Sequence, residues 1–205
     1  MGMISYFSKD EEKRAHFIFN LIAPVYGIID KGTHEDFHKM ADVLNAHIPL
    51  KGKSVLDVGC GTGAWVSRLN EYGLQKATGA DFTEKMLKIA RQKHPGVQFV
   101  LQHGENLLHF EDNSFDIVTA TFVLHGMKAE KRSKVLQEMK RVARQQVVIH
   151  DYYGPTEPIA RFFEFLEKSD YKNFKKQFAT EMQTHFDQST VLNGVKGRAL
   201  YIGTV

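Results

Sequence analysis

Residues 55–63 read Val55-Leu56-Asp57-Val58-Gly59-Cys60-Gly61-Thr62-Gly63. The mostly apolar first part predicts a short buried strand. Glycines at three alternate positions predict a tight turn at which a ligand can approach the backbone closely. The stretch opens a predicted helix, Ala64–Tyr72. A strand, a glycine turn and a helix in this order are typical of a ligand-binding α/β unit.

On the C-terminal side of this stretch, short apolar runs alternate with amphipathic segments as far as Asp151. The alternation predicts βαβ units and a parallel sheet covered by helices on both faces. The predicted strands are Ser54–Val58, Ala77–Asp81, Val97–Leu101, Phe115–Thr121 and Gln146–Asp151. The helices predicted between them are Ala64–Tyr72, Thr83–Lys93 and Glu130–Val142.

After Pro155 this alternation stops. The elements predicted there are two aromatic-rich helices, Ile159–Lys168 and Tyr171–Thr184, and two strands, Phe186–Leu192 and Arg198–Thr204. We expect Asn193-Gly194 to turn the chain between these two strands. The predicted fold is a Rossmann-like, doubly wound α/β domain over residues 51–205, with an aromatic helical insertion at about 155–184. Its sheet has seven strands and is mostly parallel, with an antiparallel last strand.

Composition indicates an ordinary single domain of 205 residues, of which 42% are hydrophobic. A net charge of +3 is too small to suggest a nucleic-acid partner. No apolar run approaches the ~18 residues of a membrane span, and the N-terminus lacks the pattern of a signal peptide. The one cysteine, Cys60, excludes an internal disulfide. We therefore expect a cytoplasmic protein without an integral membrane segment. Nothing in the sequence indicates an oligomeric state.

Two ligands suit the glycine turn. Gly59, Gly61 and Ala64 satisfy the G-x-G-x-x-G/A dinucleotide pattern, so an NAD(P)-dependent oxidoreductase is the main alternative. Asp57 argues against it, because a carboxylate at the end of the first strand would repel a pyrophosphate. S-adenosylmethionine has no phosphate and carries an ammonium and a sulfonium, which an acid attracts. Asp81 ends the second strand and could accept the ribose hydroxyls of either ligand, or cap the next helix.

These residues resemble the motifs of class I S-adenosylmethionine-dependent methyltransferases. Val55–Gly63 resembles their first motif, and Gly79–Asp81 with Met86-Leu87 resembles the ribose-binding strand and the following helix. Glu105–Leu107 and Asp112–Asp116 resemble the stretch between the third and fourth strands. The resemblance implies methyl transfer from S-adenosylmethionine to a small acceptor, which we expect to be apolar or aromatic. The expected cofactor contacts are Asp57, Gly59, Cys60, Gly61, Gly63, Asp81, Phe82, Met86, His103, Gly104, Glu105 and Thr121.

A narrower resemblance lies near the N-terminus. Phe19–Tyr26 is similar to the corresponding segment of the ubiquinone/menaquinone-biosynthesis C-methyltransferases and their small-molecule relatives. It implies an N-terminal helical lid over residues 1–50, with Tyr26 as the candidate lid residue or, alternatively, a packing tyrosine. The sequence departs from that group at two places. His103 replaces the acidic residue for the adenine amino group, and His125-Gly126 replaces a characteristic Arg-Asn.

Histidines suggest two further sites. His125 lies just beyond the fourth strand, where it could act as a general base or merely pack beside the ligand. His150 and Asp151 end the fifth strand on the same edge and are open to the same two interpretations.

The segment from His34 through Glu35 to His38 matches the zinc-binding pattern H-E-x-x-H. Because no third ligand follows, a zinc hydrolase is a minor alternative and we predict no metal.

Aromatic side chains are dense after the fifth strand. Packing of two amphipathic helices accounts for many of them, and we expect some of the rings to line an acceptor pocket. The residues concerned are Tyr152, Tyr153, Phe162, Phe163, Phe165, Tyr171, Phe174 and Phe178.

Overall fold

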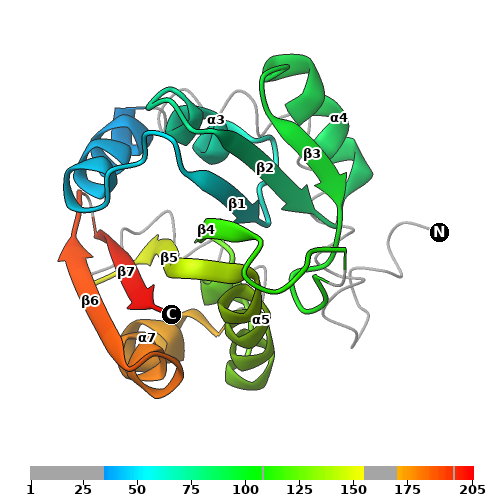
Figure 1. Cartoon of the computed structure of the whole chain (residues 1–205). Coiled ribbons are helices and arrows are strands. Elements are labelled where there is room, and N and C mark those ends of the chain that lie inside the picture. Colours follow the sequence, from blue (N-terminus) through cyan, green and yellow to red (C-terminus); the bar gives the residue numbers. More distant parts are fainter. Residues whose placement is uncertain (1–34, 108, 155–169, 196) are drawn as a thin grey trace.

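The computed structural model of the chain describes residues 35–107, 109–154, 170–195 and 197–205 (Figure 1). Tyr26, His34 and the predicted helix Ile159–Lys168 lie outside these residues. So does most of the predicted N-terminal lid segment, of which the described part is a helix over residues 35–47. Within the described ranges, no helix is long and apolar enough to cross a membrane.

Seven strands form one sheet in the order β3-β2-β1-β4-β5-β7-β6 (Figure 1). The first five strands pair in parallel, whereas β7 lies antiparallel between β5 and β6. The predicted mostly parallel sheet with an antiparallel last strand is therefore confirmed. The strands are β1 Ser54–Val58, β2 Lys76–Asp81, β3 Gln98–Leu101, β4 Phe115–Thr121, β5 Ala143–Tyr152, β6 Gln188–Asn193 and β7 Arg198–Thr204.

Helices cover both faces of the sheet, as expected for a doubly wound fold (Figure 1). The helix over residues 35–47 packs on one face with α3 (Ala64–Asn70) and α4 (Glu84–Lys93). The opposite face is covered by α5 (Ala129–Val142) and α7 (Tyr171–His185). Helix α5 buries Val135, Leu136, Met139 and Val142, the i, i+1, i+4, i+7 spacing that places apolar side chains along one helical stripe.

The connection between β6 and β7 differs from the prediction in one detail. The two strands form the predicted antiparallel pair, but Asn193 still belongs to β6 and pairs with Ala199, so the turn begins after it. Gly194 packs closely against the helix over residues 35–47, because a Cβ there would lie 2.2 Å from the Met40 sulfur. The positive φ of this connection belongs to Gly197, at 69°. The predicted hairpin is therefore confirmed, and helix packing accounts for its Gly194.

A fully buried arginine joins the two helices of the second face. The Arg132 guanidinium on α5 donates to Glu181 of α7 through Nε (2.8 Å) and Nη2 (2.5 Å). Its Nη1 donates to Asp170 (3.0 Å) and to the carbonyl of Met127, which follows the short 3₁₀ helix η1 (Leu124–Gly126). Two carboxylates and a carbonyl thus satisfy one buried cation, and the same residue fixes α7 and η1 relative to α5.

Arg132→Met should lower the free energy of unfolding by roughly 2–4 kcal/mol, because it leaves half-buried carboxylates without their cation. Arg91→Met is the matched control. Arg91 pairs with Glu84 at the exposed surface of α4, where an ion pair contributes about 0–1 kcal/mol. Urea denaturation followed by circular dichroism measures both variants. Equal losses of stability would contradict the role of Arg132.

Candidate functional site

The glycine turn folds back across the end of β2. The amides of Gly59 and Cys60 both donate to the Ala80 carbonyl, at 2.7 and 3.0 Å. Gly59 and Gly61 have positive φ, at 72° and 52°. A Cβ at Gly59 would lie 2.6 Å from a Val123 methyl, whereas a Cβ at Gly61 would meet no atom within 4 Å. The backbone at Gly61 is thus open to the approach of a ligand.

Two other residues of this turn serve packing. A Cβ at Gly63 would lie 2.6 Å from the Phe99 ring, so this glycine permits close contact between α3 and β3. The Cys60 side chain belongs to the core formed with α3 and α4, and burial raises the pKa of its thiol. A buried neutral thiol is a poor nucleophile. Only the backbone of Cys60 is therefore suited to contact a ligand.

Two buried carboxylates lie at neighbouring strand ends beside this turn. Burial raises the pKa of Asp57 to about 7; a 2.8 Å hydrogen bond from the Thr119 hydroxyl acts against this rise, and the charge of Asp81 adds to it. Asp81 accepts from the amides of Gly61 (2.9 Å) and Thr83 (2.8 Å). Its pKa is also raised, mainly by burial. A cation bound here would favour ionisation of both groups, whereas a pyrophosphate would oppose it.

The Asp81 carboxylate joins the glycine turn to the start of α4. It accepts a hydrogen bond from the amide of Thr83, the residue directly before α4. It also accepts one from the amide of Gly61, which joins the end of β2 to the glycine turn. Each carboxylate oxygen accepts one amide and keeps a further lone pair. Asp81 can therefore accept hydroxyl groups of a ligand while it holds the turn in place.

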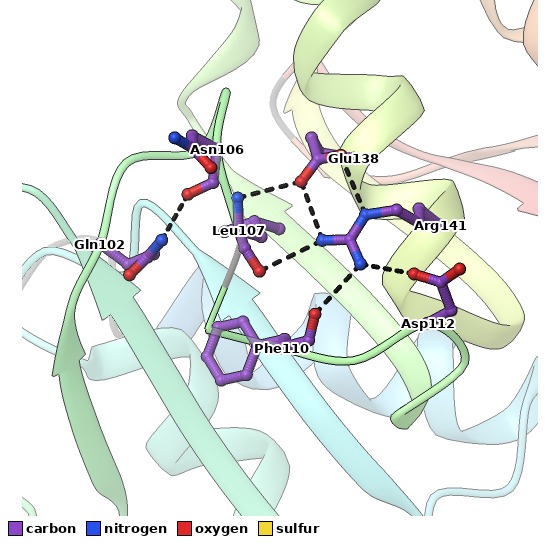
Figure 2. Close-up of polar contacts among 7 residues, drawn as sticks. All are labelled: Gln102, Asn106, Leu107, Phe110, Asp112, Glu138 and Arg141. Atoms are coloured by element: carbon purple, nitrogen blue, oxygen red, sulfur yellow. Dashed lines mark hydrogen bonds and ion pairs between the residues drawn. The ribbon is translucent and has the colours of Figure 1, made fainter.

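The segment between β3 and β4 is held by an ion pair on α5 (Figure 2). Arg141 donates to the carbonyls of Phe110 (3.0 Å) and Leu107 (3.2 Å) and to the Asp112 carboxylate (2.6 Å). Glu138 accepts from Arg141 at 2.9 Å and from the Leu107 amide at 3.0 Å. Figure 2 shows both α5 side chains pointing into this loop. The loop therefore has a defined position beyond the carboxyl end of β3.

His103, Gly104 and Glu105 lie within this loop. The His103 ring stacks on Phe82 with centroids 5.8 Å apart, and its charge lowers the pKa of Asp81, which places it beside that carboxylate. Glu105 forms a 2.8 Å ion pair with Lys131 of α5. The two rings offer a flat surface next to Asp81, on which an aromatic ligand could stack.

Two predicted contacts remain near the same edge. Met86 is buried in the first turn of α4. The Thr121 hydroxyl, at the end of β4, is buried and makes no hydrogen bond within the part of the chain that the structure describes. It could accept or donate to a bound ligand.

His125 forms a pair with Asp151 at the ends of β4 and β5. The distance from His125 Nδ1 to Asp151 Oδ1 is 2.8 Å, and the carboxylate is fully buried. Asp151 also accepts from the amides of Tyr152 (2.9 Å) and His125 (3.3 Å). The pair lies close to the glycine turn, because Val123, two residues before His125, contacts Gly59. A buried His–Asp pair of this kind can bind and release a proton.

His150 has a different environment. Both ring nitrogens are buried without a hydrogen bond within the described residues, and the rings of Trp65 and Phe122 lie 4.9 Å away. Burial, and then the charge of Arg198, lowers the pKa of His150 to about 3. His150 is thus a neutral packing residue on the face opposite Asp151.

The described aromatic residues after β5 divide between packing and the site. Phe174 and Phe178 are fully buried in the core and stack on each other at 4.3 Å, so packing accounts for both. Tyr152 and Tyr171 surround His125, at ring-centroid distances of 4.8 and 6.2 Å. Helix α7 therefore contributes mainly to the core and presents Tyr171 to His125.

Sequence reasoning missed Thr119 and Phe122. Thr119 lies inside a predicted strand, where alternation does not reveal that its hydroxyl meets Asp57. Phe122 has a φ of 53°, a left-handed conformation that bulky residues rarely adopt. Such strain is frequent at functional sites, and no sequence pattern signals it.

The zinc-binding pattern gains no support from its described residues. Glu35 pairs with Lys39, and Asp36 pairs with Arg198 of β7 at 2.8 Å. Among the residues that the structure describes, no group of three histidine, cysteine or acidic side chains could hold a metal.

Comparison with known proteins identifies relatives for most of the chain. Residues 55–146 match a family described as a methyltransferase domain. Demethylmenaquinone methyltransferase of Shouchella clausii is 34% identical over 171 residues, which are 77% of this chain and 72% of that protein. The Staphylococcus aureus enzyme of the same name is 33% identical over 172 residues, 78% of this chain and 70% of that protein.

Solved structures share the fold. Magnesium protoporphyrin IX methyltransferase from Synechocystis with bound S-adenosylmethionine has a TM-score of 0.63 and 18% identity, over 86% of this chain and 81% of its own. A putative O-methyltransferase from Nostoc punctiforme has a TM-score of 0.72 and 15% identity, over 92% of this chain and 60% of its own.

The raised pKa of Asp57 predicts a pH-dependent stability. Between about pH 4 and 7, folded Asp57 keeps a proton that the unfolded chain has released, since its ordinary pKa is 3.8. The free energy of unfolding therefore falls as pH rises through this range. Asp57→Asn removes this effect, so the variant should exceed the wild type in stability by on the order of 2–4 kcal/mol at pH 7.5 and by much less at pH 4.5.

Urea unfolding of both proteins at the two pH values measures this difference. Glu84→Gln, at an exposed position, is the control and should change stability little at either pH. A difference between Asp57→Asn and wild type that stays constant with pH would show that Asp57 ionises normally.

Proposed function

Because this chain belongs to the S-adenosylmethionine-dependent methyltransferase family that includes demethylmenaquinone methyltransferase, we propose that its acceptor is a small aromatic molecule, bound at the carboxyl edge of the sheet between the cofactor and the His125–Asp151 pair. The open backbone at Gly61, flanked by the buried carboxylates of Asp57 and Asp81, is the observation that supports the position of the cofactor. The Gly61 backbone and the two carboxylates each suit a different part of S-adenosylmethionine.

The cofactor's charge and shape fit the residues present. Asp57 faces its cationic methionine half, where ionisation of a buried acid needs a nearby cation. Asp81 accepts the ribose hydroxyls, for which it keeps lone pairs. Phe82 and His103 stack on the adenine, so stacking replaces the acidic contact that His103 does not provide. The backbone of Gly61 and Gly104 and the Thr121 hydroxyl complete the site.

The aromatic nature of the acceptor follows from the rings near the transfer site. Phe122, Tyr152 and Tyr171 lie around His125 and offer ring edges and faces to an aromatic ligand. The relatives are named for demethylmenaquinone. His125-Gly126 stands where the quinone enzymes have Arg-Asn, which favours an acceptor other than theirs.

The same geometry argues against the NAD(P)-dependent alternative. A pyrophosphate over the glycine turn would lie near two carboxyl groups whose pKa values burial already raises. Electrostatic repulsion between the pyrophosphate and these carboxylates would be strong, because the carboxylates are buried away from water.

Asp81→Asn should weaken S-adenosylhomocysteine binding about 10- to 100-fold, because a charge-assisted hydrogen bond contributes roughly 1.5–3 kcal/mol. Glu84→Gln, three residues along the chain at the exposed start of α4, is the control and should bind normally. Isothermal titration calorimetry measures both, with NAD as a second ligand that should not bind. Tight NAD binding by the unmodified protein, or unchanged affinity in Asp81→Asn, would contradict the proposed site.

A further inference from the structure

We propose that Trp65, His150 and Arg198 form a buried polar subsite that binds an oxygen substituent on the acceptor's ring, and that the Phe122 side chain covers this subsite until the acceptor enters. The inference rests on the proposed function, because it takes a small aromatic acceptor at the carboxyl edge of the sheet as given. It adds the residues that orient this acceptor and the polar group that they recognise.

The three side chains contain buried nitrogen atoms that have no hydrogen-bond partner in the part of the chain that the structure describes. They are Nε1 of Trp65, both ring nitrogens of His150 and Nε of Arg198. Trp65 is only 2% exposed and His150 is 0% exposed, so neither residue turns its nitrogens to bulk water. Buried polar groups without a partner are costly and infrequent, and a cluster of them needs an explanation. Packing explains the two rings but not their nitrogens.

The cluster lies at the carboxyl edge of the sheet, where the cofactor is proposed to bind. Trp65 is in the first turn of α3, directly after the glycine turn, and its ring centroid lies 4.9 Å from that of His150 near the end of β5. Arg198 is the first residue of β7 and pairs with Tyr152, two residues after His150. Its Nη1 donates to Asp36 at 2.8 Å, which fixes the guanidinium.

The Phe122 ring lies against two of these three residues. Its centroid is 4.9 Å from the centroid of His150 and 5.1 Å from Cζ of Arg198. It also lies 6.5 Å from the ring of His125, beside which the acceptor is proposed to bind. The Phe122 backbone has a φ of 53°, and strain of this kind is frequent at ligand-binding and switch segments. Rotation of this side chain would therefore give the acceptor access to the subsite.

The chemistry of the nitrogens indicates what they bind. Trp65 Nε1 and Arg198 Nε can only donate hydrogen bonds. Burial, and then the charge of the nearby Arg198, lowers the pKa of His150 to about 3, so its neutral ring has one donor and one acceptor nitrogen. Donors outnumber acceptors, and a carbonyl or hydroxyl oxygen on an aromatic ring has lone pairs for two donors. A few polar groups in an otherwise aromatic site fix the orientation of a ligand.

Two probes of one shape test the subsite. 1-Tetralone and tetralin share a bicyclic skeleton with one aromatic ring, and they differ in a carbonyl oxygen. Each is titrated into the full chain saturated with S-adenosylhomocysteine, and isothermal titration calorimetry gives its dissociation constant. The unmodified protein should bind 1-tetralone at least about tenfold more tightly than tetralin, as expected for one or two buried hydrogen bonds.

Variants that keep a ring and remove its nitrogens assign this preference. His150→Phe and Trp65→Phe should each reduce the preference for 1-tetralone about three- to tenfold. A change of packing alone would instead weaken both probes equally. The affinity for S-adenosylhomocysteine should be unchanged in both variants. His185→Phe, at the end of α7 and outside the subsite, is the control and should keep the full preference.

Trp65 also gives a direct reading of the contact, because it is the one tryptophan in the chain. Its indole N–H therefore gives a single signal in a proton–nitrogen NMR spectrum of isotope-labelled protein. Saturation with 1-tetralone should move this proton resonance downfield, since the indole gains a hydrogen bond. Saturation with tetralin should not.

A fourth variant tests the cover. Phe122→Gly removes the ring and keeps the three polar side chains, and glycine adopts a φ of 53° without steric cost. The preference for 1-tetralone should persist in this variant. Stopped-flow mixing should show faster association of 1-tetralone than with the unmodified protein.

The inference would be overturned by equal binding of the two probes, by no saturable binding of 1-tetralone, or by an indole signal that 1-tetralone leaves in place. A full preference in both His150→Phe and Trp65→Phe would also overturn it, and so would loss of the preference or an unchanged association rate in Phe122→Gly. If His150→Phe does not fold, Trp65→Phe decides. Absence of S-adenosylhomocysteine binding to the unmodified protein would instead contradict the proposed function, so the two failures are distinguishable.

Discussion

The burial of two carboxylates side by side, Asp57 at the end of β1 and Asp81 at the end of β2, is the constraint on which the site depends. Burial raises the pKa of both carboxyl groups, and the charge of Asp81 raises that of Asp57 further. The chain compensates partly with local donors, the Thr119 hydroxyl for Asp57 and the amides of Gly61 and Thr83 for Asp81. The remaining electrostatic cost would favour a cationic ligand over an anionic one.

Helix α5 positions both halves of the site. Arg141, Glu138 and Lys131 hold the loop that carries His103 and Glu105. On the same helix, Arg132 fixes the carbonyl that follows η1 and thereby the turn of His125. The loop that carries His103 and the turn that carries His125 are therefore both held by the same helix. Charged side chains that are paired within the fold provide this support.

Much of the fold could be predicted because strands and helices in this chain have distinct periodicities. Buried strands β1 and β4 have the predicted bounds, and Asp57, Gly61 and Asp81 could be placed at one edge because the carboxyl ends of parallel strands lie together. Strand order and pairing were not readable. The contact of His125 with Asp151 depends on β4 lying next to β5, and the contact of Asp57 with Thr119 depends on β1 lying next to β4. The Asn193-Gly194 pattern predicted the hairpin between β6 and β7, but a local pattern cannot show that Gly194 also packs against Met40.

Proton release on cofactor binding tests the central claim most directly. If Asp57 is about half protonated in the ligand-free protein at pH 7 and ionises beside the cation, binding of S-adenosylmethionine releases a proton. Calorimetry in buffers of different ionisation enthalpy measures this number. We predict release of about half a proton per site at pH 7 by the unmodified protein and markedly less by Asp57→Asn. Equal release by the two proteins, or none by either, would contradict the account.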